Sequence, residues 1–179
     1  MRIAIIVSFQ VGKTTLIEEF SHIHKHVRIF QEAYHSLEED GFDFNHPPEE
    51  HDYEAMIKRS CQDILESPQH SLFDRCPLDY MALACASESQ NWSDLPFDLD
   101  HIRDAMNLLD IVVYIPIESP DRITLNPDDT DHDFRHHGDD LVKELLFDDP
   151  LNLTQGIQSY EISGSMDQRV AKLTALIKS

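Results

Sequence analysis

The chain has 179 residues, of which 34 are acidic and 14 basic, so its formal net charge is −20. This charge disfavours nucleic acid and anionic membranes as partners, because both bind cationic surfaces. No apolar run approaches the roughly 20 residues that span a bilayer, and the three cysteines lack metal-ligand spacing. We therefore expect a cytoplasmic protein folded as a single domain over residues 1–179.

Strands and helices alternate along the chain. Apolar β-branched runs predict buried strands, and apolar residues at helical spacing predict helices. The predicted strands are 2–8, 27–30, 70–74, 111–117 and 159–163. The predicted helices are 13–24, a long helix that begins at residue 48, 77–86, 98–109, 141–147 and 166–177, with a helix or loop over 32–37. The alternation predicts an α/β fold: a five-stranded, mostly parallel sheet with helices on both faces.

One long segment fits neither pattern. Residues 121–138 are polar and rich in aspartate and histidine. The segment is too long and too charged for a core element, so we expect it to form a polar lid over a ligand site.

The most informative motif lies between the first strand and the first helix. There the sequence Gly-Lys-Thr-Thr forms the second half of the phosphate-binding pattern G-x-x-x-x-G-K-[ST]. In this pattern, backbone N–H groups at a helix N-terminus surround phosphates, the lysine reaches the terminal phosphates and the hydroxyl binds Mg²⁺. The expected nucleotide contacts are Val11, Gly12, Lys13, Thr14 and Thr15.

The first glycine of the pattern is missing, because Val7 occupies its position. Glycine normally allows the tight turn that leaves the strand. Three interpretations follow: the loop closes with different backbone angles, nucleotide affinity is reduced, or turnover is lost.

A second motif follows the third predicted strand, where residues 73–80 read Phe-Asp-Arg-Cys-Pro-Leu-Asp-Tyr. An aspartate at the end of a buried strand can hold the water shell of Mg²⁺, and the neighbouring arginine can face phosphoryl oxygens. These are Asp74 and Arg75. Together with the phosphate loop, this segment resembles the P-loop kinases of nucleosides and related metabolites, such as deoxynucleoside kinases and the nicotinamide-riboside kinase domain, and the related AAA-type ATPase-like proteins.

The resemblance implies a P-loop NTPase three-layer sandwich, with ATP and Mg²⁺ as ligands. It implies that Thr14 and Asp74 hold the metal, and that Glu32 orients or deprotonates the acceptor hydroxyl. The lid arginines, Arg122 and Arg135, would close over the transferring phosphoryl group. The turn at Gly164 and Ser165 would border the adenine ring.

Each role has a structural alternative. Glu32 could be a solvated carboxylate at a helix start, and Arg75 could form an ion pair with Asp74 or Asp79. Arg122 and Arg135 could balance the carboxylates of the lid.

The leading hypothesis is phosphoryl transfer from ATP to a small nucleoside-like or metabolite hydroxyl, in a pocket formed by Glu32, Tyr34 and residues 42–46. The alternatives are an ATPase or switch that acts on a macromolecular partner, and a degenerate nucleotide-binding module. The expected partners are a nucleotide and a small-molecule acceptor, with a homodimer as a possible assembly.

Overall fold

The computed structural model of the protein describes residues 1–7, 11–88, 92–94, 96–118 and 131–177. The strands are β1 (Arg2–Val7), β2 (Arg28–Phe30), β3 (Ser71–Asp74), β4 (Ile111–Ile115) and β5 (Gln158–Glu161). The helices are α1 (Lys13–Ile23), α2 (Ala33–Glu39), α3 (Glu50–Glu66), α4 (Pro77–Glu88), α5 (Leu99–Met106), α6 (Asp131–Lys143) and α7 (Met166–Ile177). A short 3₁₀ helix, Trp92–Asp94, and a π-helical turn, Glu144–Asp148, complete the set.

The five strands form one sheet in the order β2-β3-β1-β4-β5, and each neighbouring pair is parallel. This confirms the predicted α/β sandwich and its sheet. Strand β1 lies at the centre, with Ile5 opposite Asp74 of β3 and Val7 opposite Ile115 of β4. The last residues of β1 and β3 therefore lie at the same carboxyl edge of the sheet, where ligands bind in open parallel sheets.

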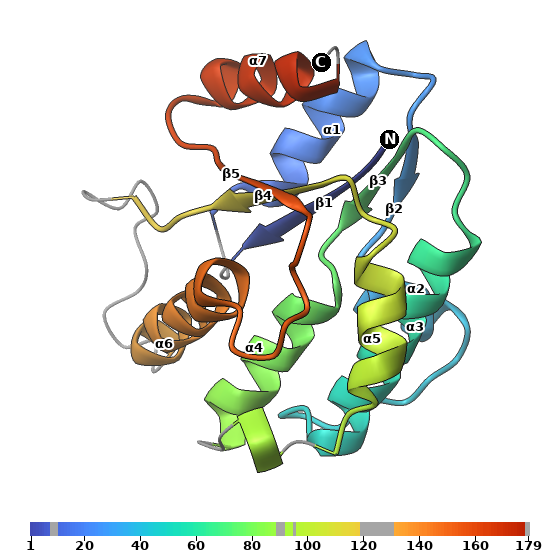
Figure 1. The fold of residues 1–179 in the computed structure, drawn as a ribbon, viewed down its shortest axis with the longest axis vertical. Coiled ribbons are helices and arrows are strands. Elements are labelled where there is room, and N and C mark those ends of the chain that lie inside the picture. The colour runs from blue at the N-terminus through green and yellow to red at the C-terminus, as the bar shows by residue number, and fades with distance from the viewer. Residues whose placement is uncertain (8–10, 89–91, 95, 119–130, 178–179) are drawn as a thin grey trace.

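Helices cover both faces of the sheet (Figure 1). Alternate residues of β1 point to opposite faces, so Ile3 and Ile5 pack with α1 and α7, whereas Ala4 and Ile6 pack with the larger group formed by α2 to α6. Helix α4 is the inner helix of that group, and it contacts both α3 and α6. Its first turn begins at Pro77, two residues after Arg75, so this buried helix positions the second motif.

The lid prediction needs a correction. Residues 131–138 are not an irregular segment: they begin helix α6, which continues without a break through residues 141–143. Arg135, Asp139 and Val142 are buried along one side of this helix. Their spacing of three to four residues is helical, but two of these positions carry charged side chains. The sequence therefore lacks the apolar pattern from which a buried helix is predicted. Residues 121–130, including Arg122, lie outside the described residues.

Other boundaries differ by a few residues. Strand β5 ends at Glu161 rather than at residue 163, and α5 ends at Met106 rather than at residue 109. Within the described part of the chain, no helix is both long and apolar enough to cross a membrane.

Candidate functional site

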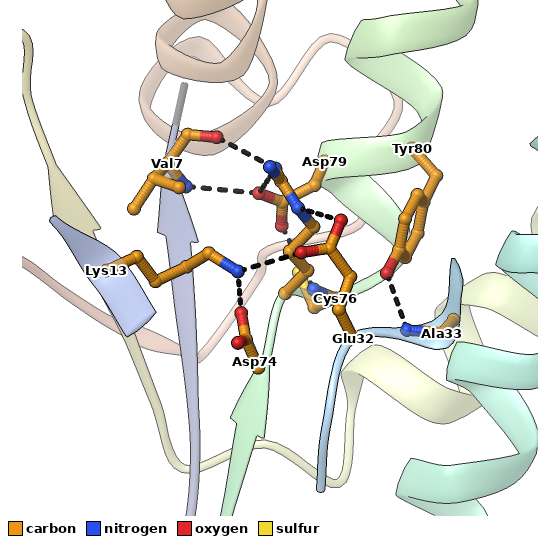
Figure 2. A network of polar contacts seen from close by, with 9 residues as sticks. Val7, Lys13, Glu32, Ala33, Asp74, Cys76, Asp79 and Tyr80 are labelled. Carbon is orange, nitrogen blue, oxygen red and sulfur yellow. Dashed lines mark hydrogen bonds and ion pairs between the residues drawn. The ribbon is translucent and has the colours of Figure 1, made fainter. Parts of the chain in front are cut away.

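The candidate site lies where β1, β2 and β3 end. Lys13 is the first residue of α1, Glu32 immediately precedes α2, and Asp74 ends β3. Three segments that are far apart in the sequence thus bring their charged side chains together (Figure 2). The predicted residues Lys13, Glu32, Asp74 and Arg75 form this cluster.

Lys13 is almost completely buried, and its Nζ lies 3.1 Å from Glu32 Oε2 and also contacts Asp74 Oδ1. Burial lowers the pKa of Lys13 to about 8, with a further lowering from the charge of Arg75 and a partial offset from Glu32. The amine is therefore held by two carboxylates close to the phosphate loop. Anionic phosphate oxygens would compete with those carboxylates for it.

Glu32 bridges two cations. One carboxylate oxygen faces Lys13, and the other accepts a hydrogen bond from Arg75 Nε at 2.7 Å. Burial raises the pKa of Glu32, but Arg75 and Lys13 together outweigh it, so the pKa lies below its ordinary value. Glu32 is not the solvated carboxylate of the alternative interpretation. Its contacts with Lys13 and Arg75 hold it in position.

Arg75 has the structural partner that the sequence left open, and that partner is Asp79 rather than Asp74. Arg75 Nη1 lies 3.1 Å from Asp79 Oδ1, one helical turn further on, and also donates to the carbonyl of Val7 at 3.1 Å. Arg75 has a φ of +76°, a left-handed conformation that L-residues rarely adopt. Such strain persists only where surrounding contacts hold it in place, and it clusters at functional sites.

Asp79 was considered in the sequence analysis only as an ion-pair partner of Arg75, and the structure gives it a further role. Its side chain is fully buried, and its Oδ1 accepts the N–H of Val7 at 3.0 Å while Oδ2 accepts the N–H of Cys76 at 3.0 Å. Together with Arg75, it secures both polar backbone groups of Val7 (Figure 2). The sequence signal was available: Asp79 lies four residues after Arg75, in the first turn of a helix that starts with proline.

Val7 is an ordinary strand residue. It pairs with Ile115, and its side chain is buried in the core beneath α1. Strand β1 therefore continues through the position at which the motif has its first glycine, and the β-branched side chain of Val7 suits a strand. Gly12, at the other end of the loop, has a φ of +81° and directly precedes α1, so the second glycine of the motif is needed for its backbone. Residues 8–10 lie outside the described residues.

Thr14 and Thr15 are exposed in the first turn of α1. A Mg²⁺ ion prefers oxygen ligands, and the Thr14 hydroxyl and the Asp74 carboxylate are groups of this kind, borne by the residue after Lys13 and by a residue that contacts Lys13. These donors fit the predicted metal, which remains a prediction.

Gly164 and Ser165 follow β5 and are connected to the phosphate loop through α7. Arg169, which the sequence analysis did not select, donates to the carbonyl of Val11 at 2.6 Å and to the carbonyl of Gly164 at 3.0 Å. Its guanidinium also lies 3.1 Å from Glu118. The sequence did contain a signal for Arg169, because this basic residue lies on the apolar face of the amphipathic helix predicted over 166–177.

A cavity of about 760 Å³ opens beside Glu32. Its walls are mainly aromatic and apolar, and they come from the segment around α2, from α3, α4 and α6. The lining includes Tyr34, Tyr53, Met56, Tyr80, Leu83 and Phe134. Pro47 and Pro48 line it in place of the predicted residues 42–46, of which Phe44 stacks under Tyr34 with ring centroids 4.4 Å apart. Arg135, the sequence neighbour of the cavity residue Phe134, is itself buried.

Tyr80 connects the cavity to the charged cluster. Its ring lines the cavity, and its hydroxyl accepts the N–H of Ala33 at 2.9 Å. Since Ala33 directly follows Glu32, this bond fixes the backbone that carries the carboxylate (Figure 2).

Comparison with known proteins identifies the fold. No family model and no curated protein matches the sequence. Among solved structures, a deoxyadenosine kinase from M. mycoides with dCMP and dCDP bound is 13% identical, with a TM-score of 0.64 and 99% of each chain covered. The chain has the fold of the P-loop nucleoside kinases.

Two further structures agree with this fold. Thymidylate kinase from Candida albicans is 13% identical, with a TM-score of 0.62, and the alignment covers 99% of this chain and 90% of that enzyme. The NadR protein, solved with NAD and AMP-PNP, is 14% identical, with a TM-score of 0.58 over 98% of this chain and 48% of NadR. The nucleoside kinase-like fold implied by the two motifs is thus confirmed.

Proposed function

We propose that the protein is a kinase that transfers the γ-phosphoryl group of ATP to a hydroxyl of a small, nucleoside-like acceptor. The observation that carries this proposal is the position of Glu32. Its carboxylate lies between the lysine of the phosphate loop and the aromatic cavity, so a group bound in the cavity could meet a phosphate chain bound at the loop. The nucleotides bound by its structural neighbours agree with this assignment.

The chain's own residues would act mainly through position and charge. Lys13 and the N–H groups at the start of α1 would hold the phosphates. Thr14 and Asp74 would hold Mg²⁺, which supplies neutralisation of phosphate charge when bound. Once Lys13 turns to the phosphates, Glu32 loses one of its two cationic partners. Its pKa then rises towards the ordinary value, which favours accepting a hydrogen bond or a proton from the acceptor hydroxyl.

The remaining predicted residues complete the proposal. Arg75 would offset charge that develops during transfer, and Arg122 and Arg135, the latter from α6 rather than from a lid, would contact the transferring phosphoryl group. Gly164 and Ser165 would border the adenine. The aromatic cavity walls suit a flat heterocycle. The charge of −20 argues against nucleic acid as the acceptor. A cytoplasmic location and a homodimer remain predictions.

The test is a panel of nucleosides and related alcohols incubated with γ-labelled ATP and Mg²⁺, scored for labelled product. We expect one acceptor class to be phosphorylated, and Glu32→Gln to reduce that rate at least about 100-fold, the scale of general-base catalysis, while Mg-ATP still binds. The matched control is Glu39→Gln, which removes an exposed carboxylate from the end of α2 and leaves the rate unchanged. ATP hydrolysis that no acceptor stimulates would instead support the ATPase alternative.

A further inference from the structure

Arg169 is unusual for its environment. In this strongly acidic chain, the lysine and arginine side chains that are buried among the described residues are Lys13, Arg75, Arg135 and Arg169. The first three belong to segments that the sequence analysis already singles out. Arg169 comes from α7, on the opposite face of the sheet from the acceptor cavity. Burying a guanidinium is costly unless its donors are well paired, so its partners indicate its task.

Those partners belong to three separate segments. Nη1 donates to the carbonyl of Val11 in the phosphate loop at 2.6 Å, and Nε donates to the carbonyl of Gly164 at 3.0 Å. Nη2 lies 3.1 Å from Oε1 of Glu118, and the same oxygen accepts the N–H of Gly164 at 2.6 Å. The guanidinium thus joins the phosphate loop to the turn after β5, and Glu118 secures both the guanidinium and that turn.

The contact with Val11 has a geometric consequence for Gly12. The peptide bond between them is planar and trans, so its C=O and N–H point in opposite directions. Arg169 draws the carbonyl towards α7, and the N–H of Gly12 must therefore point away from α7. The guanidinium lies close to this peptide, because a Cβ built on Gly12 would be 3.9 Å from Arg169 Nη1. The N–H so directed belongs to the residue that precedes the N-terminus of α1, where anions bind.

The loop is held from outside at both described ends. At its start, Asp79 and Arg75 hold the N–H and the C=O of Val7. At its end, Arg169 holds the C=O of Val11. We propose that Arg169 is a positioning residue that directs the Gly12 N–H towards bound phosphate, and that Glu118 holds Arg169 for this purpose. In a loop without its first glycine, side-chain contacts set the direction of a phosphate-binding amide. The inference rests on the proposed nucleotide site.

The experiment compares Arg169→Met with Lys172→Met, by calorimetric titration with Mg-ATP and with Mg-tripolyphosphate. Lys172 is the matched control, because it lies on the same helix and donates to the carbonyl of Ser163, in the same turn, without reaching the phosphate loop. We expect Arg169→Met to weaken both ligands at least about tenfold, as befits the loss of a charge-assisted contact, and Lys172→Met to leave both unchanged. A loss for ATP alone would place the effect at the base and overturn the assignment.

A second variant separates positioning from stability. Arg169→Met takes the guanidinium away from the partly buried carboxylate of Glu118, which destabilises the fold. The double variant Arg169→Met/Glu118→Gln removes that carboxylate charge as well. We expect its melting temperature to recover towards wild type while both affinities stay at least about tenfold weaker, since the Val11 carbonyl is still released. Affinity that recovers together with stability would show a purely structural role and overturn the proposal.

The Gly12 amide can also be observed directly in ¹⁵N-labelled protein. Its resonance should shift when Mg-tripolyphosphate binds to wild type, and the shift should be lost in Arg169→Met at saturating ligand. An equal shift in both proteins would contradict the inference. Failure of the proposed function has a different result: wild type itself would not bind Mg-ATP, and the assignment of Arg169 would fall with the nucleotide site.

Discussion

Replacing Asp79 with alanine tests whether the network around Val7 holds the site together. Asp79 is fully buried and accepts two backbone N–H groups and one guanidinium N–H. The substitution leaves the N–H groups of Val7 and Cys76 without their acceptor and deprives Arg75 of a buried counter-charge. All three changes act in the folded state, because water satisfies the same groups in the unfolded chain.

The structure sets the scale of the loss. Breaking a buried ion pair by removing one partner costs about 3–5 kcal/mol of unfolding free energy. For a chain of this size, that corresponds to a melting temperature roughly 6–20 °C lower. The chain also contains a control of the same spacing. Arg59 pairs with Asp63 four residues later at 3.2 Å, but both side chains are partly exposed, so Asp63→Ala should cost only about 0–1 kcal/mol.

Urea denaturation of wild type, Asp79→Ala and Asp63→Ala at neutral pH gives the three free energies. The reasoning predicts a large gap between the two variants, with unchanged m-values if both remain two-state. If Asp79→Ala is no more destabilising than Asp63→Ala, then the network is not a stabilising feature, and the left-handed conformation of Arg75 needs another cause.

Three further predictions concern the site. Burial, and then the charge of Arg75, lowers the pKa of Lys13 to about 8, so the protonated amine is lost as the pH rises past 8. The affinity for Mg-ATP, measured by calorimetry, should therefore fall about tenfold per pH unit above pH 8 in wild type. In Lys13→Arg the affinity should stay level over the same range. Tyr80→Phe leaves the buried N–H of Ala33 unpaired, so it should cost about 1–3 kcal/mol of stability by urea denaturation and raise the acceptor KM; an unchanged KM would separate Tyr80 from acceptor binding. Gly12→Ala should weaken Mg-ATP binding in the same titrations, whereas Gly41→Ala, at a similar φ of +87° on the surface, should reduce stability by a comparable amount of about 1–2 kcal/mol and leave binding intact.

The sequence predicts the architecture well because its signals are local. Continuous apolar runs mark β1 and β4, and the pattern of α7 gives both of its ends correctly. Lys13 and Asp74 can be found from motifs because each directly borders a strand or helix whose position is predictable. Topology then brings them together, since parallel strands end at the same edge of a sheet.

The residues that were missed act on backbone groups of distant segments. Arg169 binds a carbonyl that lies 158 positions away, and no spacing rule connects α7 to the phosphate loop. Asp79 likewise serves the N–H of Val7, 72 positions earlier. Arg135 was placed in a polar lid because its neighbours are charged, although the structure buries it in α6. Local patterns reveal side chains that face a ligand more readily than side chains that hold the main chain.

The cysteines give this network a chemical reporter. Cys61, Cys76 and Cys85 are all free thiols and buried, and burial raises the pKa of Cys76 well above its ordinary value. The thiolate that reacts with alkylating reagents is therefore suppressed until the protein opens. Because the Cys76 thiol is fully buried in the segment that Asp79 holds, the rate of alkylation of this thiol reports how often that segment opens. A ligand that closes the site should slow modification at Cys76, so mass spectrometry of the modified peptides would locate ligand protection within the fold.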